Sequence, residues 1–384
     1  DPIYRQKVKN EIINSVEQGI KIGALNYTMG DELRHWTDYN EVTIDAFREE
    51  LRDIYNDIAS LNLEWGTKYN SFAEVQPVTE TDLRKGKGQL GPWLDYRLFM
   101  DTLFSDILRI GNNTAKTVDP RVKVGLEGTQ EPGNNEGYDW WKIMQAVDLV
   151  GYYKDSSSLV QRECIRSFMK PDTTVFSWIG YDMTDANEYY TNYNSWVNLL
   201  QGFNSLGIYS SSGGRDNPYE NFGIIKPDYS PTQRGKWLQR ELNDIKTGIG
   251  TLLLNAEPQN SSIAVHYSQS SILTAKLFSG MALSSSETSG AAVLGLDALF
   301  KLNHDLGYKP FFISYEQLVR GFLNNNNPKL FILSGSIAIS EEEAAAIRNY
   351  VANGGTVLSI GVNGLISNHG RLRNNAILDD IFGI

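Results

Sequence analysis

Short apolar runs alternate with long amphipathic segments over the first two thirds of the chain, and this alternation most constrains the fold. Five runs have the composition of buried strands: 20–29, 121–126, 147–153, 173–180 and 206–211. Segments with apolar residues at helical spacing separate them: 3–19, 43–61, 94–117, 138–146, 189–203 and 231–248. Such alternation predicts a parallel α/β sheet, whose functional groups gather beyond the carboxyl ends of the strands.

Five strands are too few for a closed (β/α)₈ barrel, which has eight strands and about 250 residues. We therefore predict a (β/α)₈ TIM barrel whose first three strands precede residue 1, so that the chain is a piece of a longer protein. Residues 1–254 would form this catalytic barrel portion. The alternative is an open five-stranded sheet.

A second α/β pattern covers residues 260–384 and predicts a flavodoxin-like, doubly wound domain. Strands are expected at 262–267, 309–314, 329–333 and 356–360, and helices at 291–306 and 341–351. Ser340 precedes three glutamates, which is a strong helix start. The segment 361–364 is not a phosphate-binding loop, so no nucleotide cofactor is expected.

The charge balance excludes some classes of partner. The 384 residues include 35 Lys and Arg against 46 Asp and Glu, for a net charge of -11. Without a basic tract, the chain is not expected to bind nucleic acid or an anionic membrane. It has no apolar run of about 18 residues. One cysteine, Cys164, and no Cys/His cluster indicate neither a disulfide nor a metal site, and no organic cofactor is implied.

The run 24–32 holds the strongest candidate for catalysis. A mostly apolar stretch ends in Gly30 and two adjacent acids, Asp31 and Glu32, with His35 close behind. A carboxyl at the end of a buried strand is costly unless it is paired or used, and barrel enzymes place catalytic acids there. Glu32 is the best candidate for a general acid, with Asp31 beside it. The alternative is an acid pair that favours a helix N-terminus.

Aromatic and polar side chains near the predicted strand ends suggest a sugar-binding surface. Flat rings beside hydrogen-bonding groups suit the faces of sugars, although each ring is equally suited to a protein core. The candidates for substrate binding are Trp65, Trp140, Trp178, Tyr153, His35 and Arg215.

Several segments, taken in order, resemble the β-galactosidases of glycoside hydrolase family 42. Residues 27–32 resemble the fourth barrel strand of the family, and 61–69 resemble its Leu-Asn-x-x-Trp-Gly-Thr loop. Residues 146–153 and 200–209 resemble the sixth strand and the approach to the eighth, and 350–356 resemble the amidotransferase-like trimerisation domain. The resemblance implies a β-galactosidase-like glycoside hydrolase with Glu32 as acid/base, a carbohydrate substrate and a homotrimer.

Two departures from the family pattern leave the mechanism open. Asp31 stands where the family has Asn, and no Glu follows the strand at 174–180, where the family has its nucleophile. Asp182 or Glu127 is then the candidate partner of Glu32, in a retaining or an inverting reaction according to the distance between carboxyls. Alternatively, Asp31 and Glu32 serve a substrate-assisted hydrolysis, as in hexosaminidases, or the protein binds glycans without cleaving them. A secreted or periplasmic location is favoured over a cytoplasmic one.

Overall fold

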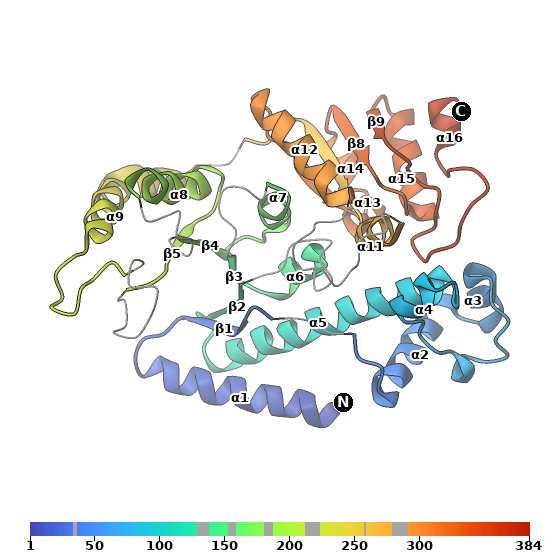
Figure 1. Ribbon diagram of the computed structural model, residues 1–384, viewed down its shortest axis with the longest axis horizontal. Helices are drawn as coiled ribbons and strands as arrows, with labels where there is room; N and C mark the ends of the chain where they lie inside the picture. Colours follow the sequence, from blue (N-terminus) through green and yellow to red (C-terminus); the bar gives the residue numbers. More distant parts are fainter. Residues whose placement is uncertain are drawn as a thin grey trace.

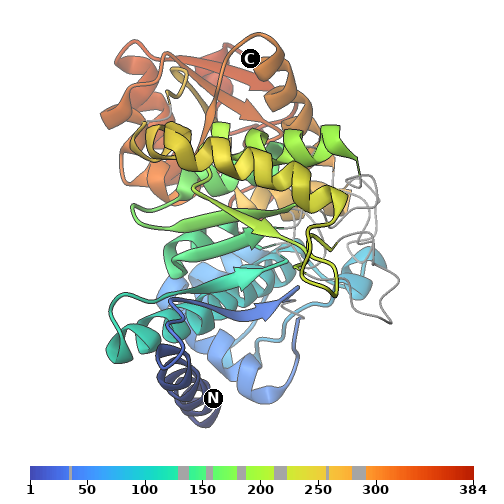
Figure 2. The ribbon, with the colours of Figure 1, turned by 90° about the vertical axis from the view of Figure 1, so that its left-hand side faces the viewer.

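The computed structural model describes residues 1–33, 37–128, 138–152, 159–179, 187–211, 223–256, 259–278 and 291–384. These residues form two parallel sheets with helices packed around them (Figure 1). The two termini lie at opposite ends of the molecule (Figure 2).

The first sheet has five parallel strands that lie side by side in chain order, from β1 to β5 (Figure 2). Its strands are β1 (Asn26–Asp31), β2 (Lys123–Glu127), β3 (Leu149–Tyr152), β4 (Thr174–Ile179) and β5 (Ser205–Ile208). Strict chain order in a parallel sheet is the arrangement of consecutive strands in a (β/α)₈ barrel. Within the described residues the sheet is open, with β1 and β5 at its edges.

The helices predicted around this sheet are present with shifted boundaries, and the segments 80–84, 159–168 and 250–255 form further helices that were not predicted from the sequence. The helices are α1 (Pro2–Ile20), α2 (Glu41–Tyr55), α3 (Ile58–Trp65), α4 (Glu80–Arg84), α5 (Leu90–Val118), α6 (Trp140–Ala146), α7 (Leu159–Phe168), α8 (Glu188–Leu200), α9 (Gln233–Asp244) and α10 (Gly250–Asn255). The predicted helix at 43–61 is in fact two. Asn56 takes a left-handed φ of 60°, and Asp57 caps α3 by accepting a hydrogen bond from the Ser60 amide at 2.8 Å.

The two faces of the first sheet differ. Leu126, Val150 and Val175 are fully buried in the main core on one face. Alternate residues point to the opposite face, where Phe176 and Trp178 keep partial solvent exposure. The first sheet therefore has one packed face and one face that retains access to solvent.

The second sheet has four parallel strands in the order β7-β6-β8-β9. The strands are β6 (Ile263–Tyr267), β7 (Phe311–Ser314), β8 (Leu330–Ser334) and β9 (Thr356–Ile360), and the helices are α11 (Gln269–Phe278), α12 (Ala291–Asp305), α13 (Tyr315–Val319), α14 (Phe322–Asn326), α15 (Glu341–Ala352) and α16 (Asp379–Phe382). This is the doubly wound, flavodoxin-like order that the sequence predicts. Ser340 and Glu343 form a full capping box at the start of α15.

The two sheets lie on either side of the predicted boundary at 254–260, yet they share one hydrophobic core. Val150 and Val175 of the first sheet belong to the same buried cluster as Val265 and Phe312 of the second. Buried polar contacts reinforce this junction. The Tyr267 hydroxyl, for example, accepts a hydrogen bond from the backbone N–H that opens α6, at 2.9 Å.

Candidate active site

The ladder between β1 and β2 brings together three of the acids that the sequence singles out. Asp31 is the register partner of Glu127, and the Glu32 amide donates a hydrogen bond to the Glu127 carbonyl at 3.0 Å. All three lie where their strands end, at the carboxyl edge of the sheet. The expected gathering of Asp31, Glu32 and Glu127 at one edge is thus a consequence of parallel pairing.

The backbone at this edge is held in an unusual conformation. Glu32 has a φ of 49°, and Gly128, the first residue after β2, has a φ of 62°. A Cβ added to Gly128 would lie 2.6 Å from Asp31 Oδ1 and 2.8 Å from Glu32 Cγ. Non-glycine residues rarely adopt a left-handed conformation, and those that do cluster at functional sites. The glycine at 128 makes room for both acids.

Glu127 is a carboxyl of this edge with a perturbed pKa. Partial burial, reinforced by the nearby Asp31 charge, raises the pKa of Glu127 above its ordinary value. Interactions with the Thr28 hydroxyl and the Trp178 indole oppose the shift. The Glu127 carboxyl therefore holds its proton more readily than a solvated glutamate, as a proton-transfer group requires.

Glycines open the exposed face beside Glu127. Glu127, Gly151 and Phe176 are in register across β2, β3 and β4. A Cβ on Gly151 would lie 2.3 Å from Phe176 Cζ, and one on Gly207 would lie 2.6 Å from Phe176 Cδ2. The Phe176 ring therefore lies over the backbone of both neighbouring strands. The result is a shallow aromatic surface next to the acids, formed by Phe176 and Trp178.

The predicted sugar-binding aromatic residues differ in their exposure to solvent. Trp178 lies on the partly exposed face near Glu127, in a position to contact a ligand. Trp140 has no exposed surface, because it begins α6 inside the shared core. Trp65 is 4% exposed, and its indole N–H donates to Asp95 at 2.9 Å within the cluster of α2, α3 and α5. Neither Trp65 nor Trp140 offers an open ring face to a sugar here.

Four other predicted site residues, Asp182, Tyr153, His35 and Arg215, lie outside the described residues. Sequence reasoning missed Thr28, Phe176 and Gly128. Thr28 and Phe176 belong to strands that the sequence does identify, and the side-chain period of two would have placed them on the face of Glu127. Gly128 follows an acid at a strand end, a position where a positive φ is expected.

Across the described ranges, no group of three or more His, Cys, Asp or Glu side chains is arranged to hold a metal ion. Among the helices that the structure describes, none is long and apolar enough to cross a bilayer.

Comparison with known proteins gives these features a family context. Residues 1–176 match the family model of glycoside hydrolase family 42, described as beta-galactosidase. A thermophilic beta-amylase of Thermoanaerobacterium thermosulfurigenes is 23% identical over 184 residues, which are 45% of this chain and 32% of that protein. The resemblance to family 42 is therefore confirmed for residues 1–176.

Solved structures share the fold over the whole chain. A beta-galactosidase from Bacillus circulans sp. alkalophilus superposes with a TM-score of 0.77 at 15% identity, over 99% of this chain and 58% of that one. The cold-adapted beta-galactosidase from Rahnella sp. R3 gives a TM-score of 0.76 at 14% identity, over 100% and 58%. An exo-carrageenase of family 42 from Bacteroides ovatus gives 0.72 at 14%, over 98% and 55%. This chain thus spans somewhat more than half the length of those proteins.

Proposed function

We propose that this protein is a glycoside hydrolase that cleaves a β-linked, galactoside-like saccharide, with Glu32 as the general acid/base. The observation that carries the proposal is the position of Glu32, left-handed at the carboxyl edge of β1 and hydrogen-bonded through its amide to the Glu127 carbonyl. The similarity of residues 1–176 to the β-galactosidase family supports it. Glycoside hydrolysis needs two carboxyls that flank the scissile bond, and this edge gathers several.

Glu127 and Asp182 are the candidates for the second carboxyl. The raised pKa of Glu127, caused by burial and the Asp31 charge, favours a proton-carrying role over a permanently ionised nucleophile. In the sequence, Asp182 follows β4, the strand that carries Trp178. In this scheme, Phe176 and Trp178 would receive the apolar face of the sugar ring.

The decisive experiment uses the intact protein with 4-nitrophenyl β-galactoside. Glu32→Gln should lower kcat by roughly 10²–10⁴-fold, which is the usual contribution of a general acid/base. Glu41→Gln, an exposed acid at the start of α2, is the control and should keep wild-type activity. Wild-type activity in Glu32→Gln would overturn the proposed role.

Chemical rescue assigns the second group. In a retaining enzyme, an acid/base variant such as Glu32→Ala should be accelerated by azide on an activated dinitrophenyl galactoside, with a β-galactosyl azide as product. Replacing the nucleophile should instead give the α-azide. Asp182→Ala and Glu127→Ala, assayed in parallel, would identify which residue attacks the sugar. Rescue of neither would favour an inverting reaction.

The substrate-assisted alternative has one structural point in its favour. The Asp31 charge raises the pKa of Glu127, so the Asp31 carboxylate lies at the same edge of the sheet as Glu127. Activity on N-acetylhexosaminides, without activity on plain galactosides, would favour an Asp31–Glu32 pair. Binding of galactosides by an inactive wild-type protein would favour a glycan-binding relative. A homotrimer stays a prediction that light scattering of the intact protein would check.

A further inference from the structure

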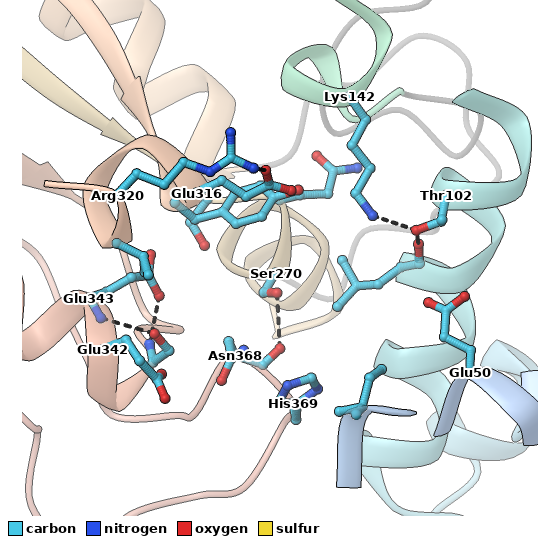
Figure 3. Close-up of a pocket in the computed structure, with 17 residues that line it drawn as sticks. Glu50, Thr102, Lys142, Ser270, Glu316, Arg320, Glu342, Glu343, Asn368 and His369 are labelled. Atoms are coloured by element: carbon cyan, nitrogen blue, oxygen red, sulfur yellow. Dashed lines mark hydrogen bonds and ion pairs between the residues drawn. The ribbon is translucent and has the colours of Figure 1, made fainter. Parts of the chain in front are cut away.

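A cavity lies between helices of the first sheet and the carboxyl ends of the strands of the second, apart from the candidate active site. It has a volume of about 460 Å³, within the usual range for small-molecule sites. One wall comes from α2, α5 and α6, and the other from residues that follow β6, β7 and β8 (Figure 3). None of Asp31, Glu32, Glu127, Phe176 and Trp178 lines this cavity.

The cavity lies at the carboxyl ends of the strands of the second sheet, where doubly wound sheets usually bind ligands. Residues 268–270 follow β6 directly, and Tyr315 follows β7. Ser340 and Glu343 stand at the start of the helix after β8. Strand order reverses around β6, so these segments diverge and leave a crevice at the carboxyl ends of the strands. Helices of the first sheet form the other wall of this crevice.

Most charged groups on the second-sheet side already have partners. Glu316 forms an ion pair with Arg320 at 2.8 Å. Glu343 hydrogen-bonds with His266 at 2.9 Å, and His369 with Asp95 at 2.7 Å. These contacts fix most of this wall, and Glu342 is its described charged residue that lies exposed without a hydrogen bond or ion pair.

Two charged side chains on the opposite wall are different. Glu50, on α2, is half-buried and has no hydrogen bond or ion pair with any described residue. Burial raises its pKa to about 7. The Lys142 ammonium, on α6, donates to the Thr102 hydroxyl, which leaves further N–H groups for a ligand. Figure 3 shows Glu50 and Lys142 on the same side of the cavity.

The remaining lining combines apolar surface with neutral polar groups. Ile54, Leu98 and Val319 supply aliphatic surface, while Ser270 and Asn368 supply a hydroxyl and an amide. An anionic ligand would meet Glu50, and a cationic ligand would meet Lys142. A neutral ligand with many hydroxyls and a C–H face would satisfy both without a buried net charge.

We propose that this cavity is a second, non-catalytic binding site for a neutral mono- or disaccharide, with Glu50 and Lys142 hydrogen-bonded to its hydroxyls and Ile54, Leu98 and Val319 packed on its C–H face. The cavity is large enough for such a ligand and is lined by both donors and acceptors. The site does not depend on the proposed hydrolysis, because it shares no residue with the acids at the first edge.

The test measures lactose and galactose binding by isothermal titration calorimetry. The intact protein carries Glu32→Gln throughout, so that hydrolysis does not consume the ligand. Two classes of site are expected, one at each location. Adding Glu50→Gln or Lys142→Met should weaken one class by about tenfold or more and leave the other unchanged. Glu50→Gln makes a charge-assisted hydrogen bond neutral, and Lys142→Met removes one.

A matched control and a steric variant make the result specific. Glu49→Gln, on α2 and exposed beside Arg52, should bind both sugars as the parent does. Val319→Trp, at a half-exposed position of the lining, removes no hydrogen bond and should abolish the second class by filling the cavity. Circular dichroism and thermal melting confirm that each variant folds.

The outcomes separate this proposal from the proposed hydrolysis. A single class of site for both lactose and galactose, or a second class that all three variants leave unchanged, would overturn it. Loss of activity in Glu32→Gln with an unchanged second class would support both proposals. An active wild-type enzyme with only one class of site would keep the hydrolase and reject the second site.

Discussion

The carboxyl edges of the two sheets are built from the same kind of parallel strand, yet their polar groups differ in burial and in hydrogen bonding. At the first edge, Glu127 is partly exposed and carries a raised pKa next to another acid. At the second edge, His266 lies buried between the Ser336 hydroxyl and the Glu343 carboxylate, each at 2.9 Å. Glu343 also accepts the Ser340 amide at 2.6 Å, which completes a capping box.

This contrast agrees with the proposed assignment of catalysis to the first edge and of stability to the second. A closed network of buried, mutually satisfied groups fixes a structure and offers no free acid for proton transfer. Acids placed side by side are instead a cost that folding alone does not explain. Positive φ values occur directly after strands at both edges, at Gly128 and at Gly335. A positive φ by itself therefore does not distinguish the first edge from the second.

The largest effect is expected from a substitution that breaks the hydrogen-bond network at the second edge. Glu343→Ala removes the partner of His266 and the capping bond, and should cost about 3 kcal/mol in the free energy of unfolding. Glu342→Ala, the exposed neighbour in the same helical turn, should cost less than about 1 kcal/mol. Denaturant titrations of both variants measure the difference. Equal losses would mean that the network is not a source of stability.

The second prediction compares two glycines with the same φ of 62°, each the first residue after its strand. Gly335→Ala should cost about 1 kcal/mol, because alanine resists a left-handed backbone. Gly128→Ala should cost more, because its Cβ would also lie 2.8 Å from the Glu32 backbone nitrogen. Only Gly128→Ala should also lower kcat, by about tenfold or more. Its Cβ would collide with Asp31 and Glu32, whereas the Cβ at 335 meets open space. A parallel loss of activity in Gly335→Ala would contradict this assignment.

The smallest effect concerns pH. The pKa of Glu127 is raised in the folded state, so the native protein binds more protons there than the unfolded chain, and stability falls as pH rises from the unfolded pKa through the folded one. Glu127→Gln should therefore match the wild type near pH 4 and be more stable at pH 8. Because the carboxyl is partly exposed, the gain should stay below about 1 kcal/mol. Thermal melts at both pH values measure it, and a destabilised variant at pH 8 would reject the argument.

Much of the fold could be predicted from the sequence, because periodicity and strand-end signals are local. The five strands of the first sheet, the four of the second and the helix start at Ser340 all follow from such patterns. The first strand is shifted, since 20–29 is an apolar run whereas β1 spans Asn26–Asp31. The end of α1 and a turn occupy the start of that run, and apolarity alone cannot distinguish a helix end from a strand.

Prediction of the site was less complete for a physical reason. Local sequence indicates that an acid ends a strand, which located Asp31, Glu32 and Glu127, but it does not indicate which rings the fold buries. Trp140 and Trp65 look like Trp178 in their polar, glycine-containing surroundings, yet only tertiary packing decides that the first two are buried. The cavity between the first-sheet helices and the second sheet has no sequence signal, because its walls come from segments as distant as Glu50 and His369.

The core that both sheets share also constrains motion. A hinge motion between the sheets would have to divide the buried cluster that holds Val175 and Phe312. It would also have to break the hydrogen bond between the Tyr267 hydroxyl and the start of α6. Interiors packed this closely do not deform continuously. The two halves should therefore move as one rigid body and should not open and close about a hinge. Any ligand that enters the interdomain cavity would then be admitted by side chains at its rim, such as the half-exposed Val319, and not by rotation of one half against the other.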